Sequence, residues 1–400
     1  MTTEATSDSS SPPAPAAALA AAGKVAVKES QSSSSSSSSG SGSDRPIEEA
    51  TSNNAPTNGN NEHDANDKGE SSGVEAPAAR PKEKEKRERN RRKNANNKTS
   101  FGNNKNKHAL PDYSTLLPKT QIAATVQAWI DDDMPSFDVG GLVVGTSPKT
   151  AQLWMKSTGI FAGKPFFDAV FDCVGCTVTW TKLAAEGKLI KASGSNRALL
   201  ATVTGPCNSI LRGERTALCA LSRCSGVATE SREAVDTARS YGWDGLVAGT
   251  RKTTPGFRIV EKYGLLVGGA ATHRLDLSQM VMLKDNHVWS AGSIEGAVKL
   301  ARRAAGFSQK IEVECRDLDE AIEAATAGAD VVMLDNYEPD KLKEDAKTLK
   351  EKFPHVLIEA SGGITAETMG EYLSEHVDVV SQGRLTQGYH CLDYSLKIKR

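Results

Sequence analysis

The sequence predicts an α/β protein in which a mixed α+β domain is followed by an incomplete parallel α/β barrel, with a disordered tail in front. Three stretches carry this prediction. Residues 1–108 are rich in Ser, Asn, Gly and Pro, residues 109–225 mix helix-like with strand-like text, and residues 226–385 alternate short apolar runs with helical text. Apolar strands that alternate with helices are typical of a parallel sheet covered on both faces.

The tail, residues 1–108, contains the serine run Ser32–Ser39, and Phe101 is its only Phe, Tyr or Trp. Such a segment cannot bury enough apolar surface to offset the entropy lost on ordering. The mixed-charge run Lys82–Lys93 is interpreted as a solvated linker, with a nuclear-localisation or nucleic-acid-binding tail as the alternative. A nucleic-acid partner is disfavoured because base stacking would have only Phe101 to use.

Composition narrows the class of protein further. The net charge of the 400 residues is -1, and no apolar run has the length of a signal peptide or a membrane span. We therefore expect no membrane association and a cytoplasmic location, with the nucleus as a second possibility. The seven cysteines are expected to be reduced. Cys173 and Cys176 form a lone C-x-x-C pair, which we interpret as structural and not as a metal or redox site.

The first domain, residues 109–225, is predicted from local patterns. Gln121–Ile130 has a helical apolar face, and Asp131–Asp133 is interpreted as the end of that helix, a magnesium-diphosphate motif being the alternative. Phe166–Trp180 and Leu199–Val203 have strand character, and Asn208–Cys224 reads as a helix. Residues 386–400, after the barrel, are candidates for packing back onto this domain.

The second domain, residues 226–385, contains six apolar strand candidates with helical text between them. The regular alternation predicts a barrel with fewer than the eight strands of a closed one. The candidate strands are Gly245–Ala248, Met280–Leu283, Lys310–Glu314, Val331–Leu334, Val356–Glu359 and Val377–Val380.

The stretch Gly249–His287 concentrates cations among small and apolar residues. Burying a cation in such surroundings is costly unless an anion meets it, so the stretch predicts a pocket for a small, multiply charged anion. Arg258 and Lys262, near Glu261 on a probable helix, are predicted to lie on the surface, whereas His273 is predicted to be a ligand. The seven cations are Arg251, Lys252, Arg258, Lys262, His273, Arg274 and Lys284.

Charged or glycine-rich groups follow every candidate strand, at the barrel end where chemistry gathers. Taken singly, each has a structural reading: a Ser-Gly-Gly run is usually a turn, and Glu314 could be part of an ion pair in the barrel core. Taken together, they predict a site for an anionic substrate plus a phosphorylated one that carries Mg²⁺, since carboxylates on neighbouring strands suit that ion and bare backbone N–H groups suit phosphate. In strand order the groups are Thr250-Arg251-Lys252, Lys284, Glu314, Asp335, Ser361-Gly362-Gly363 and Gly383.

These motifs resemble those of the quinolinate phosphoribosyltransferase family. The resemblance covers about Leu110 to Lys397 and rests on GTRKTTPGFR, EKYGLLVGG, THR, KDNH, EVEC, ADVVMLDN, EASGGIT and LTQ. GERTALCALSRCSGVAT looks like the helix between the two domains of that family. The resemblance implies a mixed α/β domain followed by an incomplete barrel, and at least a homodimer in which a residue of the partner chain enters the site.

Carried over by matching motif, Arg215 is that partner-chain residue. The quinolinate pocket would be lined by Thr250, Arg251, Lys252, His273, Arg274 and Lys284. Glu314 and Asp335 would face the ribose and the Mg²⁺ of phosphoribosyl diphosphate, directly or through water. The 5′-phosphate would be held by Ser361, Gly362, Gly363 and Gly383, and the catalytic set would be Lys252, Lys284, Glu314 and Asp335.

Two local departures from the family pattern stand out. Gln382 and Arg384 flank Gly383 where many relatives have apolar or small residues, which could alter phosphate affinity. In the first domain, Val139-Gly140-Gly141-Leu142 stands where bacterial relatives have Gly-Asp-Leu-Thr. Neither departure removes a residue of the implied site.

The resemblance implies a reaction of de novo NAD biosynthesis: quinolinate and phosphoribosyl diphosphate give nicotinate mononucleotide, diphosphate and CO₂. Three alternatives remain open from the residues. One is a barrel aldolase or isomerase in which Lys284 forms a Schiff base. The second is phosphoribosyl transfer to nicotinate, without loss of CO₂. The third is a non-enzymatic nuclear or RNA-associated role that depends on the basic tail.

Overall fold

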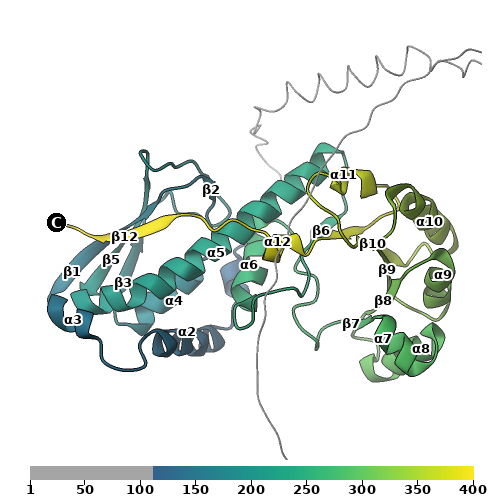
Figure 1. Ribbon diagram of the computed structural model, residues 1–400, viewed down its shortest axis with the longest axis horizontal. Coiled ribbons are helices and arrows are strands. Elements are labelled where there is room, and N and C mark those ends of the chain that lie inside the picture. The colour runs from purple at the N-terminus through teal and green to yellow at the C-terminus, as the bar shows by residue number, and fades with distance from the viewer. Residues whose placement is uncertain (1–110) are drawn as a thin grey trace, which may run out of the picture. The chain divides into compact units, whose positions relative to one another are not determined.

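The computed structural model describes residues 111–400 (Figure 1). The predictions for residues 1–108, including the charged run Lys82–Lys93, lie outside this range. Within it, the α/β class and the order of the two domains are as predicted. No helix in this part of the chain is long and apolar enough to cross a membrane.

The first domain is built on an antiparallel sheet with strand order β12-β1-β5-β3. Its edge strand β12 comes from the end of the chain and pairs with β1, so that Trp154 lies opposite Ser395. The polypeptide therefore leaves this domain, forms the barrel and returns. The strands are β1 (Pro148–Met155), β3 (Thr177–Trp180), β5 (Ala198–Pro206) and β12 (Tyr394–Ile398), with a small separate pair, β2 (Gly159–Ile160) and β4 (Leu189–Ile190).

The helices of this domain precede the sheet or pack against its core. The predicted helix at Gln121–Ile130 is confirmed within α2, which ends at Asp133, as the interpretation of the three aspartates required. The helical elements are η1 (Tyr113–Leu116), α2 (Lys119–Asp133), α3 (Val139–Val144) and α4 (Lys164–Cys173).

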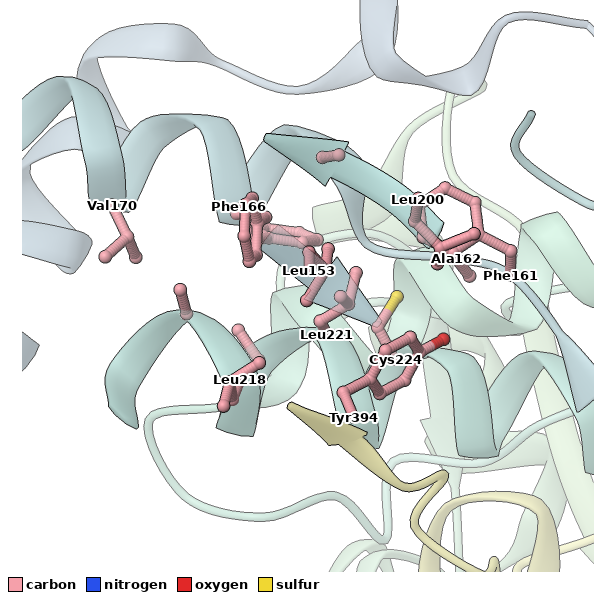
Figure 2. Close-up of a cluster of buried hydrophobic side chains, with 14 of the residues drawn as sticks. Leu153, Phe161, Ala162, Phe166, Val170, Leu200, Leu218, Leu221, Cys224 and Tyr394 are labelled. Atoms are coloured by element: carbon pink, nitrogen blue, oxygen red, sulfur yellow. The ribbon is translucent and has the colours of Figure 1, made fainter. Parts of the chain in front are cut away.

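The prediction of a strand over Phe166–Trp180 is wrong for its first half, which forms α4. Phe166, Phe167, Val170 and Phe171 are fully buried on one side of this helix, a spacing of four that suits a helix and not a strand. Pro165 at the helix start also favours this conformation. Figure 2 shows Phe166 and Val170 on α4 facing the core, with Leu218 and Leu221 of α5 nearby. The strand β3 is confined to Thr177–Trp180.

Helix α5 (Cys207–Ser240) is much longer than predicted, with 34 residues that run from the first domain to the barrel (Figure 1). The change in sequence pattern near Val227 does not end it. Instead, small residues let helix α6 approach closely: a Cβ atom on Gly264 would lie 2.8 Å from the carbonyl oxygen of Cys224, and one on Gly268 would lie 2.4 Å from Ser231 Cβ. Two glycines thus fix α6 against the helix that joins the domains.

The second domain is a parallel sheet with strand order β6-β11-β10-β9-β8-β7. Beyond β6, a parallel bridge joins Ala248 to Ala271, but no pairing within residues 111–400 joins that segment to β7. The predicted incomplete barrel is therefore confirmed. All six predicted strands are present: β6 (Leu246–Ala248), β7 (Val281–Leu283), β8 (Ile311–Cys315), β9 (Val331–Asp335), β10 (Leu357–Ser361) and β11 (Val379–Ser381).

Helices connect these strands and cover the outer face. The register of the parallel strands brings their carboxyl ends to one edge of the sheet. Glu314 pairs with Met333, Ser361 with Asp335 and Ser381 with Ala248. The helices are α6 (Arg258–Gly268), α7 (Asp285–Ala291), α8 (Ile294–Ala305), α9 (Leu318–Thr326), α10 (Pro339–Lys352), α11 (Met369–Tyr372) and α12 (Arg384–Gln387).

Candidate active site

Four charged groups meet at the carboxyl edge of the barrel sheet. Lys284, which follows β7, forms an ion pair with Glu314 at the end of the neighbouring strand β8. Asp335 ends β9, and its carboxylate accepts a hydrogen bond of 2.6 Å from Asn336 Nδ2. Burial raises the pKa of Asp335, and the charge of Glu314 adds to this, while Lys284 and Lys252 oppose it. The two predicted lysines and two predicted carboxylates therefore share one electrostatic environment.

Lys252 lies against the loop that follows β11. Its Nζ atom would be 3.6 Å, and its Cδ atom 3.1 Å, from a Cβ atom built on Gly383. Thr386 Oγ1 donates a hydrogen bond of 2.8 Å to the carbonyl oxygen of Lys252. A glycine at position 383 therefore leaves room for the lysine side chain, and the predicted residues from the first and last strands of the barrel are neighbours.

The glycine loop after β10 interlocks with the loop after β9. Gly362 and Gly363 both have a left-handed backbone, with φ of 91° and 60°, a conformation that favours glycine. A Cβ atom on Gly362 would lie 2.5 Å from the backbone nitrogen of Asn336, whose N–H donates to Ser361 O at 3.0 Å. The predicted phosphate loop is thus held directly beside Asn336, the residue that follows Asp335.

Two guanidinium groups, those of Arg251 and Arg274, have no carboxylate partner among residues 111–400. Arg251 is exposed, and Arg274 is partly buried. Burial lowers the pKa of Arg274, and the charge of Arg251 lowers it further, which shows that the two cations interact. The charge of Glu312 acts in the opposite direction on Arg274, but no carboxylate of the described residues forms an ion pair with either guanidinium. Two such cations favour the binding of an external anion.

Thr250 accepts hydrogen bonds from two lysines of the same stretch. Its hydroxyl oxygen accepts a hydrogen bond of 3.1 Å from the N–H of Lys252, and its carbonyl oxygen accepts one of 2.7 Å from Lys262 Nζ. The predicted residues after β6 therefore form a turn with a defined conformation.

The prediction that Lys262 lies on the surface is wrong, because its exposed fraction is 3%. Arg258 is partly buried, and its Nε atom donates a hydrogen bond of 3.1 Å to Thr253 Oγ1. The signal that was missed is the run Val260–Leu265, all of which is buried on α6. Glu261 and Lys262 lie inside this run and are buried with it.

His273 lies where it was predicted, but both of its ring nitrogens are engaged by the protein. Its Nε2 atom is 3.1 Å from Glu359 Oε2 and 3.5 Å from Glu312 Oε2, and its Nδ1 atom accepts a hydrogen bond of 2.8 Å from the N–H of Arg274. Because Nδ1 accepts that hydrogen bond, the proton lies on Nε2 and faces the two carboxylates. Although burial opposes it, hydrogen bonds to Glu312 and Glu359 raise the pKa of His273 to about 9. His273 thereby fixes the backbone of Arg274 from inside the barrel.

Glu312 and Glu359 are site residues that the sequence interpretation did not include. Both are buried mid-strand, and burial, followed by the charge of Glu359, raises the pKa of Glu312 to about 7. The available signal was spacing, since Glu312 and Glu314 are two apart on one strand and share a face. With His273 they could surround a cation, but a protonated Nε2 cannot ligate a metal, so this cluster is not a suitable metal site in the conformation seen.

Arg215 is exposed on α5 and makes no ion pair with the barrel site of its own chain among the described residues. Leu211 and Cys219, one helical turn to either side, are exposed as well. Helix α3 lies beside this face, where Arg212 is 3.8 Å from Asp138. Exposed apolar side chains surround the region: Phe137, Val139, Leu142, Val143 and Leu211.

The two unusual residues around Gly383 are accounted for by contacts elsewhere. Arg384 donates a hydrogen bond of 2.8 Å to Glu230 on α5. Gln382 has an exposed fraction of 1%, and its Nε2 atom is 3.4 Å from the carbonyl oxygen of Thr365. Arg384 therefore has its charge neutralised by the protein itself.

The carboxyl edge of an open parallel barrel, with these groups on it, places the chain among the α/β-barrel enzymes that bind anionic, phosphorylated substrates. Residues 138–225 match the family model of the quinolinate phosphoribosyl transferase N-terminal domain, and residues 227–397 match that of the C-terminal domain. The chain belongs to the quinolinate phosphoribosyl transferase family, as its motifs indicated.

Individual relatives agree with this assignment. The human nicotinate-nucleotide pyrophosphorylase [carboxylating] is 52% identical over 283 residues, which cover 71% of this chain and 93% of the human protein. The Dictyostelium discoideum protein of the same name is 47% identical over 298 residues, covering 72% and 99% of the two chains. The crystal structure of NadC from Streptococcus pyogenes superposes with a TM-score of 0.63 at 33% identity, covering 71% of this chain and 99% of that one.

Proposed function

We propose that the strand-end site performs the family's reaction through two adjoining anion-binding halves. The chain transfers the phosphoribosyl group of phosphoribosyl diphosphate to quinolinate, with decarboxylation, to give nicotinate mononucleotide, diphosphate and CO₂. The observation that supports two halves is that Arg251 and Arg274 interact with each other and form no ion pair with a carboxylate in residues 111–400. Lys252, which follows Arg251 in the chain, belongs to the second charged group, since its charge and that of Lys284 act on Asp335.

The first half holds quinolinate. The planar fork of a guanidinium matches a carboxylate in a bidentate geometry, and quinolinate offers two adjacent carboxylates. Arg251 and Arg274 are assigned to them, with Thr250, Lys252 and Lys284 completing the pocket. The ring of His273 is held by Glu312 and Glu359. It accepts a hydrogen bond from the backbone N–H of Arg274, and we assign it to the bottom of the quinolinate pocket.

The second half holds phosphoribosyl diphosphate. Ser361, Gly362 and Gly363 offer backbone N–H groups to the 5′-phosphate, since left-handed glycines turn such groups towards one anion. Gly383, beside the Lys252 ammonium, brings a second loop to the same end. Glu314 and Asp335 face the ribose.

We assign the family's Mg²⁺ to the Glu314–Asp335 edge. Both groups are hard oxygen donors on neighbouring strands, and Asp335 has a raised pKa partly because of the charge of Glu314, so an added cation between them would be favourable. This fits an ion held by one or two carboxylates whose remaining ligands are phosphate oxygens and water. When bound, the ion would neutralise the departing diphosphate.

The residues of the chain have three tasks in the reaction. The cationic pocket orients the pyridine nitrogen against C1 of the ribose. As the bond from C1 to diphosphate breaks, C1 becomes oxocarbenium-like, and Glu314 and Asp335 stabilise that positive charge. The nitrogen lone pair forms the new bond to C1, and the resulting pyridinium accepts the electron pair of the C2–carboxylate bond as CO₂ leaves; a proton then takes its place at C2.

The contact between Lys284 and Glu314 disfavours the Schiff-base alternative. An amine that forms an ion pair with a carboxylate is protonated, and a protonated amine has no lone pair to attack a carbonyl. The mechanism above requires no covalent nucleophile, and it requires Lys284 to be charged.

We further propose that the protein works as at least a homodimer in which Arg215 enters the partner's site. Supporting this are the exposed position of Arg215 on α5 and the exposed apolar residues beside it, such as Leu142 and Val143, which are 81% and 82% exposed. Contiguous exposed apolar side chains mark interaction surfaces. We place the protein in the cytoplasm, with the nucleus as the alternative raised by Lys82–Lys93.

Quinolinate labelled in its C2 carboxylate tests the proposed function. With phosphoribosyl diphosphate and Mg²⁺, we expect labelled CO₂ in equal amount to the nicotinate mononucleotide formed. A chain that begins at residue 109 is the control for the tail, and we expect it to retain turnover. Phosphoribosyl transfer to nicotinate at a rate equal to or above that with quinolinate would contradict the proposal, and so would loss of turnover in the shortened chain.

A further inference from the structure

Lys262 is a buried cation that the reaction scheme above does not use. It lies on α6 with an exposed fraction of 3%, and its Nζ atom donates hydrogen bonds to the carbonyl oxygens of Thr250, at 2.7 Å, and of Thr272. No carboxylate forms an ion pair with it among residues 111–400. Its ammonium is therefore satisfied by the backbone of two loops and not by a counter-ion.

Those two carbonyl groups belong to the segments that carry the quinolinate cations. Thr250 directly precedes Arg251, and Thr272 directly precedes His273 and Arg274. The backbone pairing between the two segments ends with Gly249 N–H donating to Ala271 O at 2.9 Å. Beyond that point, Lys262 provides the hydrogen bonds that join the two loops in the described part of the chain.

The position is an unfavourable one for a lysine. Burial, together with the charges of Arg258, Arg251 and Arg274, lowers the pKa of Lys262 to about 8, while Glu261 opposes them. A buried charge without a paired counter-ion is a poor source of stability. His273, next to Thr272, has a left-handed backbone with φ of 55°, which a residue other than glycine adopts only when its surroundings hold it there.

We propose that Lys262 is a positioning residue for the substrate pocket: by joining Thr250 O to Thr272 O, it sets the separation between Arg251 and Arg274 at which the two carboxylates of quinolinate fit. This rests on the assignment of that pocket to quinolinate in the proposed function. Phosphoribosyl diphosphate is bound by other loops, so the effect of Lys262 is selective for the acceptor.

Lys262→Met tests the selectivity, because it removes the ammonium and keeps a similar length. We expect KM for quinolinate to rise about tenfold or more, the effect of losing a charge-assisted hydrogen bond, while KM for phosphoribosyl diphosphate stays within about twofold. Lys350→Met is the control, since Lys350 Nζ donates to Val356 O at 2.8 Å and forms an ion pair of 2.7 Å with Asp378, both at the other end of the barrel sheet. We expect it to leave both KM values unchanged. Equal rises in both KM values for Lys262→Met would overturn the proposal.

Calorimetry supplies a second measurement that needs no turnover. Quinolinate carboxylates would offset the charges of Arg251 and Arg274, which raises the proton affinity of Lys262, so binding at about pH 8.5 should take up a fraction of a proton from the buffer. Titrations in two buffers of different ionisation enthalpy measure this uptake. His273, whose pKa its two carboxylates raise to about 9, can also take up a proton at this pH and is present in all three proteins. We therefore expect equal uptake in the parent protein and in Lys350→Met, and a smaller uptake in Lys262→Met. Identical uptake in the parent and in Lys262→Met would overturn the proposal.

The two proposals fail in different ways. If the parent protein binds quinolinate but releases no labelled CO₂, the proposed function is wrong, and the role of Lys262 is still decided by the calorimetry. If CO₂ is released normally and Lys262→Met binds quinolinate as the parent does, only the role of Lys262 is wrong. Thermal unfolding of Lys262→Met, together with its affinity for phosphoribosyl diphosphate, distinguishes a lost pocket from a lost fold.

Discussion

The interior of the first domain is apolar, whereas the carboxyl half of the barrel interior is charged. Around α4, the first domain buries Phe161, Phe166, Phe167 and Phe171 completely, and the rings of Phe167 and Phe171 are in contact. The barrel buries Glu261, Lys262, Glu312 and Glu359 instead, and several of their oxygens have no hydrogen-bond partner. Both domains have an apolar core, but the barrel in addition buries charged side chains close to the residues assigned to substrate binding. The comparison teaches that the first domain is built for stability alone, whereas the barrel combines a stable core with a charged site.

Phe167→Ala tests how much the aromatic core of the first domain contributes to stability. Phe167 is fully buried, and its ring centroid lies 4.8 Å from that of Phe171 and 5.2 Å from that of Trp180. We expect a loss of about 4 kcal/mol in the free energy of unfolding, because the cavity cannot close around so large a gap. Denaturant unfolding measures it. KM for both substrates should be unchanged in the folded fraction, and a changed KM would show that the two regions are not separable.

Glu314→Ala and Asp335→Ala remove the paired carboxylates from the charged side. We expect turnover to fall by about a hundredfold or more in each, as when a group that stabilises transition-state charge is removed. The dependence on magnesium concentration should shift to higher values, because each variant deletes a hard oxygen donor. Steady-state assays across a magnesium titration check both points. Unchanged titration curves in both variants would remove these carboxylates from the metal's surroundings.

Arg274→Ala has a narrower effect. Because its guanidinium has no internal carboxylate partner, removing it leaves no unpaired buried anion, and the protein should keep its stability. We expect quinolinate binding to weaken by about thirtyfold, the loss of a charge-assisted contact, with a much smaller change for phosphoribosyl diphosphate. Direct binding measurements for each substrate decide. Equal losses for both would mean that the pocket has been assigned to the wrong anion.

The difference between the regions also explains what could be predicted from the sequence. The six barrel strands were predicted because a continuous apolar run reports a strand covered on both faces, as in Val331–Asp335. The strand-end residues followed from that pattern together with the barrel rule. In the first domain, the four buried apolar residues of α4 have a composition typical of a strand but the spacing of a helix. The spacing is the better guide to the conformation there.

Other features depend on tertiary contacts that a local pattern can suggest but cannot establish. The burial of Lys262 follows from the packing of α6 on α5, which needs Gly264 and Gly268. Glu312 and Glu359 lie close together only because the strands β8 and β10 both direct side chains into the interior of the barrel. The role of Arg215 would depend on a second chain, so neither the sequence pattern nor a single chain defines it.

The smallest expected effect concerns Glu186, a partly buried carboxyl in the otherwise apolar domain. Its Oε1 atom accepts hydrogen bonds from the N–H groups of Gly163, at 3.0 Å, and Lys164, at 2.6 Å. Burial nevertheless raises its pKa from 4.5 to about 7. The folded state therefore holds this proton more tightly than the unfolded state does, so its contribution to stability is full below pH 4.5 and is lost as the pH rises towards 7.

Glu186→Gln isolates this contribution. The amide oxygen can still accept from the same two N–H groups, and the side chain no longer titrates. Between pH 5 and pH 6.5, we expect the parent protein to lose stability relative to the variant by on the order of 1 kcal/mol, measured by denaturant unfolding at each pH. Quinolinate turnover should keep its pH profile, because Glu186 belongs to the stabilising region. A parallel pH dependence of stability in the two proteins would mean that Glu186 is ionised in the fold, and that the first domain tolerates buried charge as the barrel does.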